Sequence, residues 1–438
     1  MRHFHKQVTG ALSTLTKSAV ACAIVASVSA SALAEKIAIT GAQIHTMASS
    51  GVIAEGTILL DNGKIQQVLD SDSVPAGYRE IDASGKVVTP GFIGAMTSLG
   101  LEEVSLSAGV VDARVHAHPV SSVGAAYDVS FGVNSDSTLI PITRVEGFTH
   151  AVTGISRTGQ LFNGQGAIID LGGSFNAVLK PKAFMHVDVS DRGADTNGES
   201  RAAMWVALNQ SLDEAVFASS YDLSPSADWD GMITRADAKA LTSVVSGEVP
   251  LLISANRASD IMQALAIKSR FADLNLVLVN ATEGWRVASD IASADVPVIL
   301  NPENNLPGGF DQLGATLENA ARLHKAGVMI AIGMDTHNIR LAPQHAGNAV
   351  ANGLPHAAGL AALTLNVAKI FGVDDSMGSL EPGKDAHLVI WSGDPLEVTE
   401  AAEQVFIGGE PVEMTSRQIQ LRDRYLNRDE TKPVAYTR

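Results

Sequence analysis

The chain has 438 residues, of which 46% are hydrophobic and 18% are charged, and its formal net charge at pH 7 is -16. This length can bury a large core, enough for one large barrel and a small accessory domain. The acidic balance argues against nucleic acid and anionic lipid as partners, because both are themselves negatively charged. The single cysteine, Cys22, lies in the N-terminal apolar run, so we expect no disulfide or thiolate chemistry in the rest of the chain.

The first 34 residues have the pattern of a secretory signal peptide. A basic segment precedes an apolar run at 18–28, and the motif Ala32-Leu33-Ala34 follows as a cleavage site. The apolar run is too short to be a stable membrane anchor. Cleavage after Ala34 leaves 404 of the 438 residues and changes the formal charge from -16 to -19, because three basic residues are removed. We therefore expect a periplasmic or secreted protein with no membrane segment after processing.

Residues 35–86 are predicted to be all β. Runs rich in β-branched residues are separated by turn residues, and Asn62-Gly63 between two of these runs is typical of a tight hairpin. A second β-rich region, 373–416, lies near the other end of the chain. Neither region alone is large enough to hide its apolar face, so we expect the two to form one composite β-sandwich. The charged tail at 417–438 is expected to be peripheral.

Residues 87–372 are predicted to form a β/α barrel. Buried strand patterns alternate with helix patterns, which indicates parallel strands joined by helices. Strands are expected in the first half of 87–101 and at 147–155, 166–173, 250–256, 274–281, 296–302 and 327–335. Helices are expected at 202–215, 259–272, 313–325 and 360–371. About eight such units fit this length, and the polar segment 189–201 is expected to be a long loop.

Several of these segments resemble the amidohydrolase superfamily, in particular its imidazolonepropionase-like, metal-dependent hydrolases. The stretch VVTPGFIGAMTSLGL at 87–101 is similar to the family's first barrel strand, V-x-P-G-F-I-D-x-H-x-H, and GSLEPGKDA at 378–386 is similar to its C-terminal signature. The resemblance implies an α/β fold, a TIM-type (β/α)8 barrel with a small composite β-sandwich. It also implies a hydrolase that acts on non-peptide carbon–nitrogen bonds of a small amide.

The family's metal ligands are missing from the matching positions of this chain. In the family, histidines after strands one, five and six and an aspartate after strand eight hold one or two divalent metals. Only Asp335 matches, and the histidine positions are occupied by Met96, Ser98, Ser254, Asn256 and Asn280. A divalent transition metal needs about three or more protein ligands of suitable softness. We therefore expect the family's metal site to be lost and no cofactor to be present.

Asp335 is the candidate catalytic residue, because the family uses this carboxylate to carry the proton from water to the leaving nitrogen. Without a metal, a buried carboxylate needs new partners, and its pKa should rise. We expect it to be hydrogen-bonded to neutral polar groups at the barrel mouth. The candidate substrate-binding residues are Ser98, Ser254, Asn256, Asn280 and His337. Together these residues would line a polar, uncharged pocket for a small-molecule ligand.

Two alternatives remain open from the sequence. The first is a displaced zinc site, because His116-Ala117-His118 is itself an H-x-H motif and further histidines lie at 150, 186, 337, 345 and 356. The second is a non-catalytic barrel that binds a small molecule or acts as a subunit, either in a homo-oligomer or in a hetero-oligomer with an active paralogue. The enzyme and binding hypotheses differ in whether any carbon–nitrogen bond is cleaved.

Overall fold

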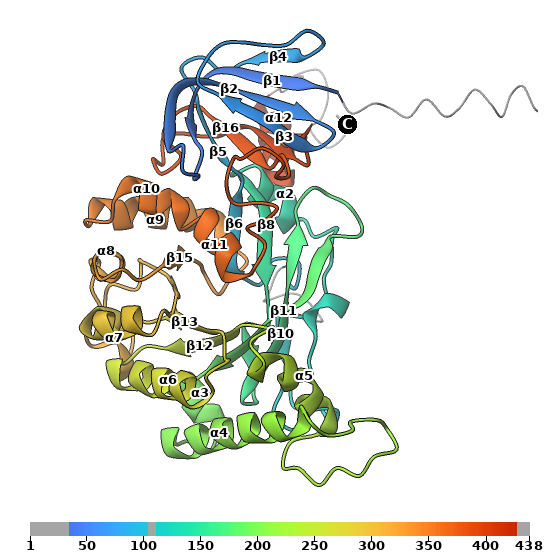
Figure 1. Ribbon diagram of the computed structural model, residues 1–438, viewed down its shortest axis with the longest axis vertical. Helices are drawn as coiled ribbons and strands as arrows, with labels where there is room; N and C mark the ends of the chain where they lie inside the picture. The colour runs from blue at the N-terminus through green and yellow to red at the C-terminus, as the bar shows by residue number, and fades with distance from the viewer. Residues whose placement is uncertain (1–34, 104–110, 427–438) are drawn as a thin grey trace, which may run out of the picture.

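The computed structural model describes residues 35–103 and 111–426. The predicted signal peptide at 1–34 and the end of the charged tail therefore lie outside the described residues. The structure is a mixed α/β fold with two eight-stranded sheets (Figure 1). One of them, the barrel sheet, curves into a barrel, and the other, which belongs to the smaller part of the chain, is called the small sheet below. A separate two-stranded sheet pairs β7 Arg114–Val115 with β9 Arg157–Thr158. Within the described part of the chain, no helix is long and apolar enough to cross a membrane.

The small sheet combines strands from both ends of the chain, which Figure 1 shows as blue and red strands side by side at the top of the view. Its strand order is β18-β17-β16-β5-β1-β2-β3, with β4 beside β1. The strands are β1 Ile37–His45, β2 Val52–Asp61, β3 Lys64–Leu69, β4 Arg79–Asp82, β5 Val87–Pro90, β16 Leu388–Trp391, β17 Ala402–Ile407 and β18 Glu410–Pro411. The turn between β2 and β3 is at Asn62-Gly63, where both residues have positive φ, as the hairpin prediction requires.

The barrel sheet contains eight strands in the order β15-β14-β13-β12-β11-β10-β8-β6. They are β6 Phe92–Thr97, β8 Phe148–Thr153, β10 Phe162–Asp170, β11 Val178–Asp188, β12 Leu251–Ala255, β13 Leu276–Asn280, β14 Val298–Leu300 and β15 Ile330–Ile332. The two outer strands approach each other, and the backbone N–H of Met334 donates to the carbonyl of Met96 at 3.0 Å. The sheet is therefore a nearly closed barrel.

The expectation of uniformly parallel β/α units is wrong for one strand. β10 runs antiparallel to both of its neighbours, β8 and β11, whereas the other neighbouring pairs in this sheet are parallel. The connections on either side of β10, at 154–161 and 171–177, contain no helix. They are too short for the crossover that a parallel pair needs, so the chain reverses direction instead.

The predicted first strand is divided between the two sheets. β5 belongs to the small sheet and β6 to the barrel, and Gly91 lies between them. The N–H of Gly91 donates to the carbonyl of His387 in the small-sheet region, whereas the next N–H, of Phe92, donates to Gly147 beside β8. A Cβ on Gly91 would lie 2.3 Å from the side chain of Thr149, so only glycine fits at this crossing point.

Most of the helices lie beside the barrel sheet, whereas α12 Arg417–Leu426 has no buried residue and lies near the small sheet (Figure 1). The others are α2 Leu139–Arg144, α3 Asp191–Thr196, α4 Arg201–Ala218, α5 Arg235–Val245, α6 Ala258–Arg270, α7 Ala288–Ser293, α8 Asn319–Lys325, α9 Ala342–Ala351, α10 His356–Ala361 and α11 Leu365–Ile370. The helices expected at 202–215 and 259–272 are confirmed as α4 and α6. The segment 189–201 contains α3 and is not simply a loop.

Two predicted helices are shorter than the pattern indicates, because tertiary hydrogen bonds remove part of each. The helix expected at 313–325 begins only at Asn319, since the N–H of Gly314 donates to Glu283 Oε1 at 2.9 Å instead of joining a helix. The helix expected at 360–371 is broken into α10 and α11. The carbonyls of Ala362 and Leu363 accept hydrogen bonds from barrel residues Ile332 and Ile93, both at 2.9 Å.

Candidate active site

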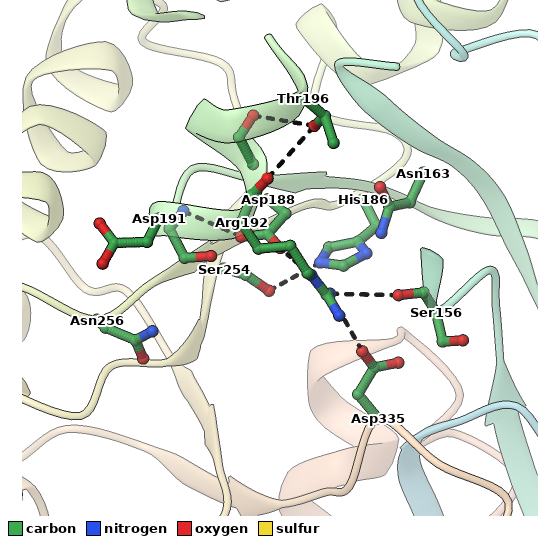
Figure 2. A network of polar contacts seen from close by, with 12 residues as sticks. Ser156, Asn163, His186, Asp188, Asp191, Arg192, Thr196, Ser254, Asn256 and Asp335 are labelled. Atoms are coloured by element: carbon green, nitrogen blue, oxygen red, sulfur yellow. Dashed lines mark hydrogen bonds and ion pairs between the residues drawn. The ribbon is translucent and has the colours of Figure 1, made fainter. Parts of the chain in front are cut away.

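The carboxyl ends of the barrel strands gather polar and charged side chains at one end of the sheet. β11 ends at Asp188, β13 ends at Asn280, and Asp335 follows β15. Because the carboxyl ends of parallel strands meet at the same edge, residues far apart in sequence come together there. Figure 2 shows several of them around one arginine, Arg192, which comes from α3.

Arg192 links the two sides of this site. Its Nε donates to Asp188 Oδ2 at 3.0 Å, and its Nη2 donates to the backbone carbonyl of Ser156 at 3.2 Å. The same Nη2 lies 3.6 Å from Asp335 Oδ2 (Figure 2). Asp188 is itself buried and accepts a hydrogen bond from the N–H of Ser190. The guanidinium is therefore fixed by two acceptors and directed toward the Asp335 carboxylate.

Asp335 does not have the neutral partners that the sequence analysis expected. Its side chain forms an ion pair with Arg192, and the candidate donors Ser98 and His337 contact Glu102 instead. The side chain of Asp335 is also 31% exposed, so it lies in an open site. Burial still raises the pKa of Asp335 to about 6, Arg192 opposes this rise, and the nearby Asp188 adds to it. Near neutral pH the carboxyl is thus close to its titration point.

Ser98, Glu102 and His337 form a second cluster. The Ser98 hydroxyl donates to Glu102 Oε1 at 2.9 Å, and His337 Nδ1 lies 2.6 Å from the same oxygen. An ionised carboxylate only accepts hydrogen bonds, so this contact places a proton on His337 Nδ1. The serine donates to the carboxylate and not to the histidine, so the cluster is not a nucleophilic triad.

Ser254 and Asn256 are both engaged in buried hydrogen bonds. Ser254 Oγ lies 2.8 Å from His186 Nε2, and Asn256 donates to Asp311 at 3.0 Å and accepts from Thr282 at 2.8 Å. Burial lowers the pKa of His186 to about 4, so this imidazole is neutral at pH 7. The predicted contact of Ser254 and Asn256 with substrate is untested and stays a prediction.

Asn280 is the last residue of β13, where the chain leaves the sheet. It has a φ of 67°, and its side chain is partly exposed. Asparagine adopts this left-handed conformation more readily than most residues, which explains its suitability at the strand end. Its role as a substrate-binding residue is likewise a prediction.

Further ion pairs hold α3, α4 and α6 together beside the site. Arg201 pairs with Asp191 on α3 and with Asp260 on α6, where Nε lies 3.2 Å from Asp260 Oδ2. Arg257 makes two 2.8 Å contacts to the same carboxylate of Asp260. Bidentate pairs of this kind fix geometry as well as charge. They brace the segment that carries Arg192.

The side chains at the barrel mouth do not fit the divalent metal that the superfamily implies. In the described residues there is no group of three or more His, Cys, Asp or Glu side chains that could hold a metal ion. The two carboxylates at this site, Asp188 and Asp335, lie on either side of a guanidinium, whose fixed positive charge opposes a second cation between them. Met96, at a family ligand position, is a buried residue of β6.

The displaced zinc site has no support from the described part of the chain. His116 and His118 are both exposed, and His118 Nδ1 accepts a hydrogen bond from the N–H of Val120 at 3.2 Å. His150 and His186 are buried in β8 and β11. His356 pairs with Asp394 at 2.8 Å, and its ring centroid lies 5.8 Å from that of His45, but the described residues around them form no group that could hold a metal ion.

The sequence analysis missed Asp188, Arg192 and Glu102. A buried run at 183–187, apolar except for His186, directly precedes Asp188, and this run is the signal that could have placed a strand and its end there. Glu102 has no such local signal, since its partner His337 is 235 residues away in the sequence.

Comparisons with known proteins agree with this architecture. Residues 261–414 match the sequence profile of the Amidohydrolase family. A 57-residue stretch is 42% identical to the amidohydrolase tasK of Hapsidospora irregularis, although this match covers 13% of the chain and spans only 6% of the length of that curated relative. The solved structure of an amidohydrolase from Thermotoga maritima MSB8 is 26% identical, with a TM-score of 0.76, and the match covers 86% of this chain and 100% of that chain.

Two further solved structures share the fold alone. A molinate hydrolase and phenylurea hydrolase B are each 16% identical to this chain, with TM-scores of 0.53 and 0.52. The matches cover 93% and 87% of this chain, and 98% and 97% of those chains. The match of residues 261–414 to the Amidohydrolase family and the likeness to the amidohydrolase from Thermotoga maritima support membership of the amidohydrolase superfamily.

Proposed function

We propose that this protein is a hydrolase that cleaves a non-peptide carbon–nitrogen bond of a small amide at the site around Asp335. The observation that carries the proposal is the Asp335 carboxyl, which has a pKa of about 6 and faces a fixed guanidinium at the barrel mouth. A general base is most effective when its pKa lies near the working pH. Membership of the amidohydrolase superfamily supports the reaction class.

Each charged side chain at the site has a role in this proposal. Ionised Asp335 removes a proton from a water molecule as the water oxygen bonds to the amide carbon, and then gives the proton to the nitrogen as the carbon–nitrogen bond breaks. Arg192 donates to the carbonyl oxygen while negative charge develops on it. Asp188 is a positioning residue, because it holds the guanidinium in place.

We also propose that the superfamily's metal does not take part. The support is chemical, because Met, Ser and Asn occupy the matching positions and do not supply the ligand set of a transition metal. In its place, Arg192 supplies positive charge beside Asp335. Export to the periplasm, or secretion, is part of the same proposal and rests on the sequence of residues 1–34.

The composite domain is a further proposal. Pairing of β16 with β5 across the two chain ends supports it. If the small sheet needs both ends, truncation near residue 375 will abolish soluble expression. Soluble, folded protein after this truncation would contradict a composite domain.

The test uses the chain that begins at Glu35, assayed against a panel of simple amides, hydantoins and acyl-amino acids. We expect turnover by the wild-type protein that a chelator does not reduce, and a loss of about 10²–10⁴-fold in Asp335→Asn. Asp195→Asn, an exposed carboxylate on α3, is the matched control and should be unaffected. Metal-dependent turnover would contradict the metal-free proposal. Ligand binding without any turnover would instead favour a binding barrel.

A further inference from the structure

A second cavity lies away from the barrel mouth, at the end of α4 and in the α4–α5 connection at 219–234. Its volume is about 510 Å³, and none of the residues that line it belongs to the site around Asp335. Figure 1 shows this connection extending from the end of the molecule opposite the small sheet. The cavity is therefore a separate feature, and the proposed hydrolysis leaves it unexplained.

Three aromatic rings form one wall of this cavity. Phe217 and Tyr221 are stacked with ring centroids 5.4 Å apart, and Trp229 lies 6.3 Å and 6.1 Å from them. Phe217 is 58% exposed and Tyr221 is 41% exposed, although such rings normally bury their faces. The face of an aromatic ring carries partial negative charge and attracts cations.

The connection is held in shape by its own hydrogen bonds. Trp229 Nε1 donates to the carbonyl of Ile233 at 2.8 Å, and Glu214 accepts from the N–H groups of Met232 and Ile233 at 3.0 Å each. Arg235 donates to the carbonyls of Pro225 and Ala227. A site that is ordered before binding loses less conformational entropy when a ligand arrives.

The charge around the rings is negative. Asp228 and Asp230 line the cavity and are exposed, and within residues 35–103 and 111–426 neither is paired with a basic side chain. Asp213 also lines it but is neutralised by Arg270 at 2.6 Å. The lining contains no Lys or Arg. Exposed aromatic faces and unneutralised carboxylates thus meet in one cavity.

We propose that this cavity binds a quaternary ammonium group. Such a cation has a large, weakly hydrated surface that stacks on aromatic faces, while nearby carboxylates balance its charge. A small metal ion would instead require several oxygen ligands directed at one point, and the aromatic wall does not supply them. A neutral apolar ligand would gain nothing from Asp228 and Asp230. The group can belong to a free molecule or to a phosphatidylcholine headgroup.

The first experiment is calorimetric titration of the chain from Glu35 with choline, beside its neutral carbon isostere 3,3-dimethylbutan-1-ol. The account predicts saturable 1:1 binding of choline, at least about tenfold tighter than the isostere, and weaker binding as salt increases. Equal binding of the two compounds, or no saturable binding at about 10 mM choline, would overturn the proposal.

Variants then separate the charge from the rings. Asp228→Asn combined with Asp230→Asn should weaken choline binding about three- to tenfold, and Tyr221→Leu should weaken it about tenfold. Asp290→Asn, an exposed carboxylate on α7, is the matched control and should leave binding unchanged. Thermal unfolding checks that each variant is folded. Unchanged affinity in folded charge and ring variants would place choline elsewhere and refute the proposal.

An experiment with lipid vesicles distinguishes the two sources of the quaternary ammonium group. Sedimentation with phosphatidylcholine vesicles that is lost in Tyr221→Leu assigns the lipid headgroup, whereas choline binding without sedimentation assigns a free molecule. Amide hydrolysis should be the same in all these variants. Choline binding therefore tests the cavity, and amide turnover tests the proposed function, independently of each other.

Discussion

The two sides of the barrel sheet differ in how their strands are joined. On one side, β12 to β15 are parallel strands, and helices lie in the connections between them. On the other side, β8, β10 and β11 run up and down, with helix-free connections. Asp335 comes from the first side, and Arg192 with its support Asp188 comes from the second. We call β12 to β15 the regular side and β8, β10 and β11 the irregular side. The regular side therefore supplies the carboxylate that matches the superfamily's catalytic aspartate, and the irregular side supplies the positively charged Arg192 beside it.

The largest expected effect concerns the anchoring of the irregular side. Asp237, on α5, is fully buried, and it accepts from Ser122 N at 2.8 Å, Ala126 N at 2.9 Å and Thr234 Oγ1 at 2.8 Å. Asp237→Ala removes the buried acceptor of these partly buried donors, so we expect a loss of about 3 kcal/mol in the free energy of unfolding. Urea unfolding measures this loss.

A surface carboxylate provides the control for Asp237. Asp213 is 42% exposed in its pair with Arg270, so Asp213→Ala should cost less than about 1 kcal/mol. If the two variants lose similar stability, the 121–126 segment is not anchored through Asp237, and the irregular side is less rigid than described.

The next prediction separates the charge of Arg192 from its size. Under the proposed function, Arg192→Gln should lower kcat by about 10²–10³-fold, because a donor to the developing oxyanion is removed. Arg192→Lys should recover part of the activity, since it keeps a positive charge but not the planar, two-sided geometry. Kinetics on the panel substrate that the wild type turns over measure both. Arg114→Gln, at an exposed arginine, is the control. An Arg192→Gln variant with wild-type activity would show that the reaction at Asp335 does not need the guanidinium from the irregular side.

The sequence identified the regular side better than the irregular one, for a physical reason. Strands such as β12 and β13 begin with buried apolar runs, at 251–253 and 276–279, and these runs are visible in the sequence. β11 begins with alternating exposed residues, includes Pro181, and bends at Lys182, where φ is 53°. That bend breaks the apolar pattern, so both β11 and the charged residues after it were missed.

Contacts between distant segments were also beyond the sequence analysis. Residue types at Ser98 and His337 indicated a polar pocket, but their shared partner Glu102 depends on two loops meeting in the fold. The exposed position of Asp335 and its pairing with Arg192 depend on the same kind of long-range packing. A pattern within one segment contains no information about such pairs.

A smaller effect is expected on the pH dependence of the free energy of unfolding, to which Asp335 contributes. Because the pKa of Asp335 is raised to about 6 in the folded state, above its ordinary value of 3.8, folding favours the protonated form. Stability should fall as pH rises from about 4 to about 6, and Asp335→Asn should remove this dependence. This difference in pKa implies a change of about 3 kcal/mol in the free energy of unfolding, which solvent screening of the partly exposed carboxyl reduces to about 1–2 kcal/mol.

Urea unfolding at pH 4 and at pH 7.5 measures this difference. We expect Asp335→Asn to be more stable than the wild type at pH 7.5 and similar to it at pH 4. Asp195→Asn again serves as the control. A variant that is less stable than the wild type at pH 7.5 would mean that the pair with Arg192 outweighs burial.

The central claim is that a carboxylate from one side of the barrel and a guanidinium from the other form one coupled pair. The most direct test is a ¹³C NMR titration of the aspartate carboxyl carbons, with the Asp335 signal assigned by its loss in Asp335→Asn. The account predicts a pKa of about 6 in the wild type and a higher pKa in Arg192→Gln, because removing the positive charge disfavours the ionised form. A titration midpoint near the ordinary aspartate value of 3.8 that Arg192→Gln does not move would contradict it.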